Sequence, residues 1–307
     1  MSDQTRGFLY IIFGVTLLGL LSMSIKIIYG LGISERNLTP LFTLIIAIVS
    51  FMNVFKFKRE KIKLKETKLK YMILQGVFGS AIYVACFYRS LIYLDASVSI
   101  MILYSNCIFV FLYETLIKRK KVSTVGIISL IVLLVGLILT TGVFSESLQV
   151  SSIGILYAIV ASLGFAFQNI NLCENLSDVD TTVSLLYTSL FSFITLVAFY
   201  GPKNIIDFQP TILNISVLLF IAVVTGYLPA LLQYKGILLV GAYKASVISS
   251  LEIPITAVMA FFILSEKLNI TQIIGMILIV TGSIYIQKNQ QISIKTKTRN
   301  EVLKVKF

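Results

Sequence analysis

Histidine is absent from the sequence, and charged residues are scarce, making up 13% of its 307 positions. A soluble domain carries about 25% charged residues, so this chain has too few to cover a surface that faces water. The lack of histidine removes the commonest general base and metal ligand. Cys86, Cys107 and Cys173 lie in or beside apolar runs without metal-ligand spacing, and no H-E-x-x-H motif is present. We therefore expect no enzymatic activity, no metal and no cofactor, and interpret the cysteines as small apolar fillers.

Long runs of apolar residues are abundant in the sequence. Hydrophobic residues make up 57% of the chain and the mean hydropathy is +0.93, which is typical of a protein whose solvent is lipid. A helix needs about 20 residues to cross a bilayer. The ten runs near this length are 7–28, 39–55, 71–93, 96–117, 122–143, 152–173, 182–200, 213–240, 243–264 and 270–287. The sequence therefore predicts an all-α membrane protein with ten transmembrane helices.

The second half of the chain repeats the first. Tyr88-Arg89 recurs as Tyr234-Lys235, 146 residues later, and Gly7-Phe8-Leu9-Tyr10 recurs as Gly154-Ile155-Leu156-Tyr157, 147 residues later. The repeat predicts two five-helix units. We place them at 1–143 and 152–287, followed by a loose, basic cytoplasmic tail at 288–307.

The net charge of +12 is concentrated in short polar segments between the apolar runs. This distribution argues against a nucleic-acid partner and is typical of a membrane protein, whose cytoplasmic loops are rich in lysine and arginine. Alternating spans place 20 basic residues on one side and 3 on the other: Arg36, Lys203 and Lys267. We predict a multi-pass protein of the plasma (inner cell) membrane with both termini cytoplasmic. Because each half has an odd number of spans, the two repeats are expected to be inverted.

One stretch of the second half carries a family resemblance. Its motifs are Tyr234-Lys235-Gly236, Ala245-Ser246, Leu251-Glu252-Ile253-Pro254, Ser265-Glu266-Lys267-Leu268 and Gly275. They resemble the drug/metabolite transporter superfamily, and specifically its EamA-type members, although no proline stands opposite Pro254 in the first half. The resemblance implies a ten-helix inner-membrane carrier, often an exporter of amino acids, metabolites or toxic compounds.

Two polar residues in the spans are too deep to reach the headgroups. Glu252 and Asn106 lie roughly 12–15 Å from the starts of their predicted helices at a rise of 1.5 Å per residue, and they are equivalent under the repeat. A polar group at this depth is costly and is by default a candidate for function. Hydroxyls on the same two spans extend the candidate substrate site, unless they only pack helices together: Ser105, Ser246, Ser249, Ser250 and Thr256.

Other polar residues in the spans have two interpretations each. Lys26, Arg89 and Lys235 lie near the ends of their helices and can extend to the headgroups. In the alternative interpretation, Arg89 or Lys235 faces the cavity and pairs with an anionic group on the substrate. Tyr83 is a candidate site residue, but it also ends a stripe of small residues, Gly76, Gly79 and Ser80, that is typical of close helix packing. Glu114 is expected to pair with the nearby basic block at the membrane interface. Gln168, Asn169 and Asn171 approach a cytoplasmic helix end and are interpreted as interfacial.

These features predict a secondary transporter of small metabolites, amino acids or drug-like compounds, more an exporter than an importer, that works by alternating access. No nucleotide-binding motif is present, so the energy is expected from an ion gradient, the membrane potential, exchange or the substrate's own gradient. A proton or another ion is the candidate coupling partner. Glu252 is the candidate to carry that proton, or to remain ionised beside a substrate ammonium or Lys244. The alternative is a membrane sensor or interaction partner that transports nothing. The sequence does not indicate an oligomeric state.

Overall fold

The structure is a computed structural model that describes residues 1–30, 35–57, 66–120, 123–140, 151–202, 211–264 and 268–304. All regular structure in these ranges is helical. Nine helices are long and apolar enough to cross a membrane, and a tenth apolar helix, Thr124–Thr140, is shorter. The all-α prediction with ten apolar helices is confirmed for the described part of the chain.

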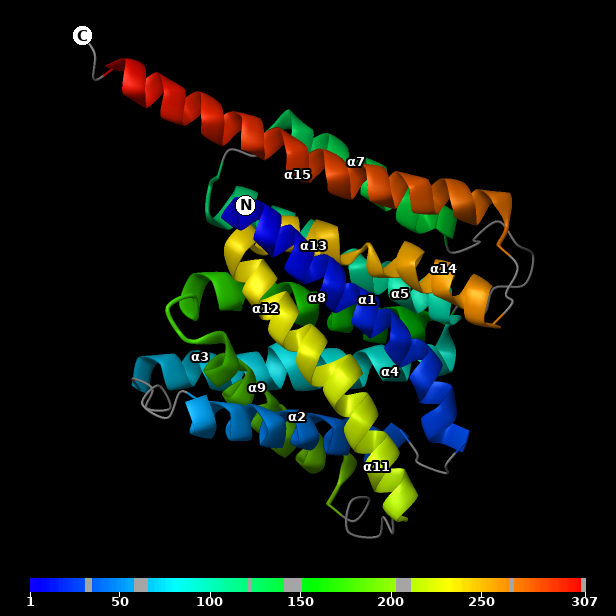
Figure 1. Ribbon diagram of the computed structural model, residues 1–307. Helices are drawn as coiled ribbons and strands as arrows, with labels where there is room; N and C mark the ends of the chain where they lie inside the picture. The colour runs from blue at the N-terminus through cyan, green and yellow to red at the C-terminus, as the bar shows by residue number, and fades with distance from the viewer. Residues whose placement is uncertain are drawn as a thin grey trace.

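Each half of the chain contributes five of these helices (Figure 1). The first half comprises α1 (Asp3–Gly30), α2 (Glu35–Phe57), α3–η2–α4 (Glu66–Gly76, Val77–Ile82, Tyr83–Tyr93), α5–α6–η3 (Ala96–Tyr104, Asn106–Leu112, Tyr113–Ile117) and α7 (Thr124–Thr140). The second comprises α8 (Ser152–Asn175), α9 (Thr181–Tyr200), α11–η4–α12 (Ile212–Ile221, Ala222–Tyr227, Leu228–Val240), α13–α14 (Ala242–Ser249, Glu252–Leu264) and α15 (Ile270–Lys304).

The helices exceed the predicted spans at several ends. The span expected at 71–93 begins at Glu66, because the polar residues before Tyr71 are compatible with a helix that leaves the bilayer. The largest correction concerns the segment 288–307, which was expected to be loose, whereas α15 continues to Lys304. Residues 288–304 contain no glycine or proline and many straight-chain residues, which favour helix.

The third span of each half contains a π-helical turn at an equivalent place. The turn is Val77–Ile82 in the first half and Ala222–Tyr227 in the second, about 145 residues apart. Such wide turns interrupt the regular spacing of side chains around a helix and are frequent at functional sites. The duplication therefore extends to an irregularity of the backbone.

The direction of α8 relative to α3–α4 follows from two glycines. A Cβ placed on Gly154 would come within 2.8 Å of Tyr93, and one on Gly164 within 2.9 Å of Tyr83. Since higher numbers on one helix meet lower numbers on the other, the two helices are antiparallel.

The same reasoning applied to α13 shows that the repeats are inverted. Asn169 of α8 bonds to Ser246, and Cys173 lies beside the main chain of Ala242, so α13 also runs antiparallel to α8. The chain reverses between α12 and α13 at Gly241, whose φ of 88° suits a residue without a Cβ. Helix α12 is thus antiparallel to α4, its equivalent in the first half, as the odd number of spans predicts.

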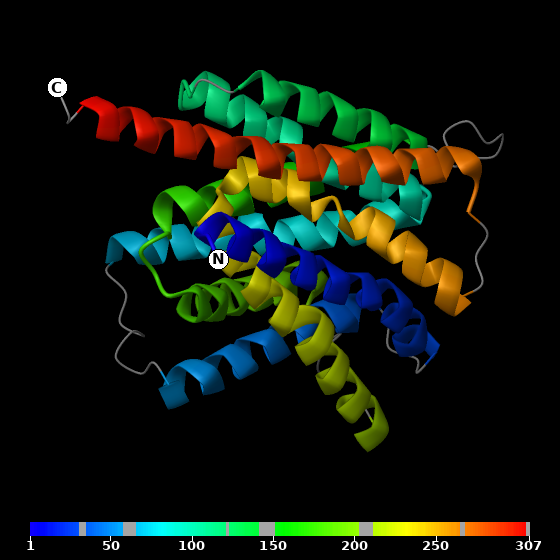
Figure 2. The same ribbon diagram turned by 45° about the horizontal axis from the view of Figure 1, so that its top comes forward.

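Helices α7 and α15 lie side by side at one edge of the bundle (Figures 1 and 2). A Cβ on Gly136 would lie 2.8 Å from the carbonyl oxygen of Gly275, and one on Gly275 would lie 2.7 Å from that of Gly136. Gly282 approaches the carbonyl oxygen of Ser129 in the same way, at 3.2 Å. Gly136 and Gly282 are repeat equivalents, as are Ser129 and Gly275, so this contact is symmetric between the halves.

Both ends of the ten-helix body lie on one face, which we call the terminal face. There the Gln287 side chain donates to the main-chain oxygen of Gln4 at 3.0 Å, and the Gln4 side chain donates to Leu239 at 3.0 Å. Lys68 and Lys118 of the first half form ion pairs on this face with the second half, with Asp178 and Glu174 respectively. The hydrogen bond to Glu174 raises the pKa of Lys118, which therefore stays protonated.

Candidate functional site

The fourth span of each half is broken in its middle. In the first half, Ser105 separates α5 from α6, and its hydroxyl donates to the Ile102 oxygen at 2.6 Å. In the second, Ser250 and Leu251 separate α13 from α14, and the Ser250 hydroxyl donates to Val247 at 2.7 Å. In both breaks a serine hydroxyl satisfies a carbonyl of the preceding turn, which is how serine competes with helical hydrogen bonding.

Proline adds to the break in the second half only. Pro254 has no N–H, so the Ser250 carbonyl cannot receive the usual bond from four residues ahead. The N–H of Ile253 takes its place at 3.1 Å. In the first half the N–H of Ile108 bonds to the Ser105 oxygen at 2.8 Å in the same tight pattern without any proline.

The first break lies beside the middle of α8. The Ser162 hydroxyl donates to the Leu103 oxygen at 3.1 Å and lies 3.4 Å from the Ser105 hydroxyl. Ser162 is near the centre of Ser152–Asn175, so the first break is at mid-helix depth, and a hydrogen bond between Tyr104 and Glu252 joins the second break to it. Half-helices that meet at mid-membrane are a recurring architecture of transporter binding sites.

Glu252 begins the half-helix α14 and bonds across the bundle. Its Oε2 accepts a hydrogen bond from the hydroxyl of Tyr104, which is the last residue of α5. The Tyr104 ring meets Phe165 of α8 edge-on at 6.1 Å between centroids, and Phe165 stacks on Tyr83 at 5.2 Å. We call Tyr83, Tyr104 and Phe165 the aromatic wall. The absence of a side chain at Gly164 lets Tyr83 approach α8 closely.

Asn106 is the repeat equivalent of Glu252 and begins α6. It is completely buried, and neither its Oδ1 nor its Nδ2 has a hydrogen-bond partner among the described residues. Burying a polar group that has no hydrogen-bond partner costs free energy on folding, because the group loses its hydrogen bonds to water. Its retention at mid-membrane depth suits a residue whose partner is a ligand.

The remaining predicted site residues take different places. The hydroxyls of Ser105 and Ser250 bond to their own helices, which agrees with the alternative that they serve helix packing. Ser249 is buried. Arg89 is half-buried and lies further along α4 than Tyr83. Glu252 forms no ion pair with any described residue. Lys244, considered as its partner, instead donates to the Gln4 Oε1 at 2.6 Å.

Two expectations about interfacial residues have different outcomes. Glu114 pairs with Lys120 at 3.3 Å, as predicted. Asn169 and Asn171, interpreted as interfacial, are instead buried, each 1% exposed. The reason is that α8 lies in the centre of the bundle, where even its polar end is covered by α3, α12 and α13.

Sequence reasoning missed a buried amide network at that end. Gln75 donates to the Gln168 main-chain oxygen at 3.2 Å, and Asn171 donates to the Gln75 Oε1 at 2.7 Å. Gln75 also lies 3.4 Å from the Tyr234 hydroxyl. Gln75 is an uncharged polar residue within the apolar run 71–93. A single polar side chain among apolar ones is the sequence feature that could have indicated a buried hydrogen bond. The network joins both halves between the site and the terminal face.

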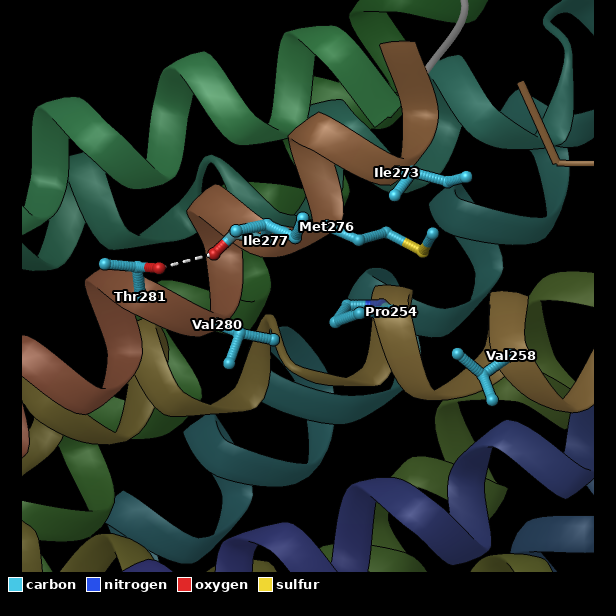
Figure 3. A pocket seen from close by; sticks show the side chains of 7 residues that line it. All are labelled: Pro254, Val258, Ile273, Met276, Ile277, Val280 and Thr281. Carbon is cyan, nitrogen blue, oxygen red and sulfur yellow. Dashed lines mark hydrogen bonds between the residues drawn. The ribbon is translucent and has the colours of Figure 1, made fainter. Parts of the chain in front are cut away.

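A shallow apolar groove lies between α14 and α15 (Figure 3). It is lined by Pro254, Val258, Ile273, Met276, Ile277, Val280 and Thr281. The one hydroxyl there bonds to its own helix, at the Ile277 oxygen. The groove offers no polar group to a ligand and does not include Glu252.

Inverted five-helix repeats with half-helices that meet at mid-depth define a multi-pass membrane transporter. The EamA-like transporter family model matches residues 5–142 and 152–287, and the chain belongs to that family. It is 24% identical over 241 residues to a protein of Clostridium kluyveri described as an uncharacterized transporter, covering 76% of each chain. A protein of known crystal structure shares the fold, with a TM-score of 0.72 at 13% identity over 92% of this chain and 96% of that one.

Proposed function

We propose that this transporter is a gradient-driven exporter of small organic solutes, and that it works by alternating access around Glu252 and Asn106. The observation that carries the proposal is the pair of equivalent helix breaks at mid-depth, which holds one carboxylate and one unpartnered amide. Tyr83, Ser105, Ser249, Ser250 and Arg89 surround or flank this pair in the proposed site. The sequence carries no nucleotide-binding motif, so a proton or another ion gradient supplies the energy.

The proposed orientation puts the terminal face in the cytoplasm, with the protein in the plasma membrane. The terminal face carries Lys68, Lys118 and Lys120, in agreement with the positive-inside rule. Cysteines at Lys120 and Lys61 of a cysteine-free variant should resist an impermeant thiol reagent in intact cells. Cysteines at Lys203 and Lys267 should react. Lys61, Lys203 and Lys267 lie outside the described residues. The reverse labelling pattern would reject this orientation.

Transport is tested with the purified full-length protein in liposomes. Vesicles are loaded with a mixture of labelled amino acids, nucleosides and organic cations, and efflux is followed with and without an imposed proton gradient. We expect loss of at least one labelled compound to be faster than from protein-free vesicles and to depend on the gradient. If compounds bind but none moves under any gradient, the protein is the alternative, a membrane sensor that does not transport.

A further inference from the structure

We propose that the site takes a small, monovalent organic cation, held by the Glu252 carboxylate against the aromatic wall. This inference rests on the proposed function, because it names the substrate class of the same site. It uses the charge of the site, its ring geometry and its accessibility, each of which is independent of the direction of transport.

Charge is the first argument. When Glu252 is ionised, its carboxylate is a negative charge without an ionic partner among the described residues, with one hydrogen bond from Tyr104. The nearest basic side chain on its own span, Lys244, is committed to Gln4. A carboxylate in a low-dielectric site attracts a cation strongly, because there is little solvent to screen it. A cationic ligand would neutralise the Glu252 carboxylate, with which Arg89 forms no ion pair in the described structure, whereas an anionic ligand would lie beside a second negative charge.

Ring geometry is the second argument. Tyr83 and Phe165 are nearly parallel, with 11° between their planes, and Tyr104 is turned by 78° to Phe165. Aromatic faces attract cations through the ring quadrupole, and rings set at an angle to each other offer faces in two directions. Tyr104 belongs to the aromatic wall and also donates its hydroxyl to Glu252, so this hydrogen bond fixes the carboxylate relative to the aromatic wall.

Accessibility is the third argument. Tyr104 and Phe165 are buried, at 3% and 4% exposure, whereas Tyr83 and Glu252 are only half-buried. As whole residues, Glu252 and Tyr83 are therefore more exposed than the two rings behind them.

The closing experiment compares a cation with its neutral isostere. Choline and 3,3-dimethyl-1-butanol have nearly the same shape and differ in charge, because a carbon replaces the quaternary nitrogen. Benzyltrimethylammonium serves as a second cationic probe. Binding of each to the full-length protein in nanodiscs is measured by calorimetry at pH 8. We expect both cations to bind at least tenfold more tightly than the neutral alcohol.

Matched variants locate the binding. Glu252→Gln should weaken the binding of both cations at least tenfold, whereas Glu114→Gln, at the interfacial pair with Lys120, should leave it unchanged. Tyr83→Leu should weaken binding severalfold. Tyr93→Leu is its control, because Tyr93 stacks on Tyr157 between the same two helices at 6.1 Å, away from the carboxylate. Should Glu252→Gln fail to fold, Glu252→Asp, which keeps the charge, is expected to retain cation preference.

The outcomes separate this inference from the proposed function. Equal binding of choline and its neutral isostere, or cation binding unchanged by Glu252→Gln, overturns the inference. If the liposome assay moves only neutral or anionic compounds, the cation class is wrong and transport stands. If cations bind through Glu252 but nothing moves, the cation site stands and the transport proposal fails.

Discussion

The broken span of the first half and that of the second share a backbone but differ in chemistry. Asn106 and Glu252 each begin the half-helix after the break, yet Glu252 accepts a bond from Tyr104 and Asn106 has no described partner. The repeat equivalent of Tyr104 is Ser250, which is too short to reach across and bonds to Val247 instead. The duplicated frame thus supports one charged and one neutral position at the same depth.

This difference indicates a division of roles between the halves. In the proposed site, the half with Glu252 provides the charge that a substrate or proton can neutralise, and the half with Asn106 provides donors and an acceptor that cannot change charge at neutral pH. Four variants test whether the two halves are as different as the surroundings of Glu252 and Asn106.

Glu252→Gln should have the largest effect. It preserves shape and removes the charge, so it loses hydrogen bonds to a charged group worth about 1.5–3 kcal/mol. That corresponds to roughly a tenfold to hundredfold loss of transport rate at low substrate concentration. Rates in liposomes check it, with yield and melting temperature as controls for folding. A variant that transports at the wild-type rate would make Glu252 a structural residue.

Exchanging the residues, Asn106→Glu with Glu252→Asn, should lower transport as much as Glu252→Gln does. If the halves are interchangeable at mid-depth, the exchanged protein should transport better than Glu252→Gln alone. We expect no such rescue, because the repeat equivalent of Tyr104 is Ser250, whose hydroxyl bonds to Val247 and not to position 106. Rescue measured in the same liposome assay would contradict the proposed division of roles.

Asn106→Leu should separate stability from activity. Removing a buried amide without a described partner also removes its desolvation cost, so the melting temperature should stay level or rise. Transport should fall about threefold to tenfold, in line with a neutral hydrogen bond of about 0.5–1.5 kcal/mol. A variant that is both less stable and equally active would identify Asn106 as a packing residue.

Pro254→Ala should have the smallest effect. The first half forms its break without proline, through Ser105, so the Ser250 hydroxyl should hold the second break as well. We expect less than about a threefold change in transport, from a free-energy change below about 0.7 kcal/mol. Loss of cation binding in this variant would show that the two breaks are maintained differently.

Sequence periodicity and repetition were sufficient for the helices and their inversion, because apolar length and charge bias act over whole segments. The pairing of Glu252 with Tyr104 was not predictable, since tyrosine is unremarkable in an apolar run and its partner is 148 residues away. Both helix breaks were also missed. The sequence indicates Ser105 as a hydroxyl within a span. Whether that hydroxyl bonds to a carbonyl of the preceding turn, and so accompanies a break in the helix, is visible only in the structure. The depth of Glu252 and Asn106 was accessible because it follows from counting residues.

The ion pairs of the terminal face have a consequence for the kinetics of the cycle. Lys68 with Asp178 and Lys118 with Glu174 join one half to the other, but the repeat places Leu264 opposite Lys118 and isoleucines opposite Glu174. The two ends of the permeation route would thus respond differently to the surrounding electrolyte. Salt on the terminal side weakens the partly exposed charge pairs by screening and should speed separation of the halves there, whereas Leu264 and the isoleucines cannot form an equivalent of the Lys118–Glu174 pair on the other side.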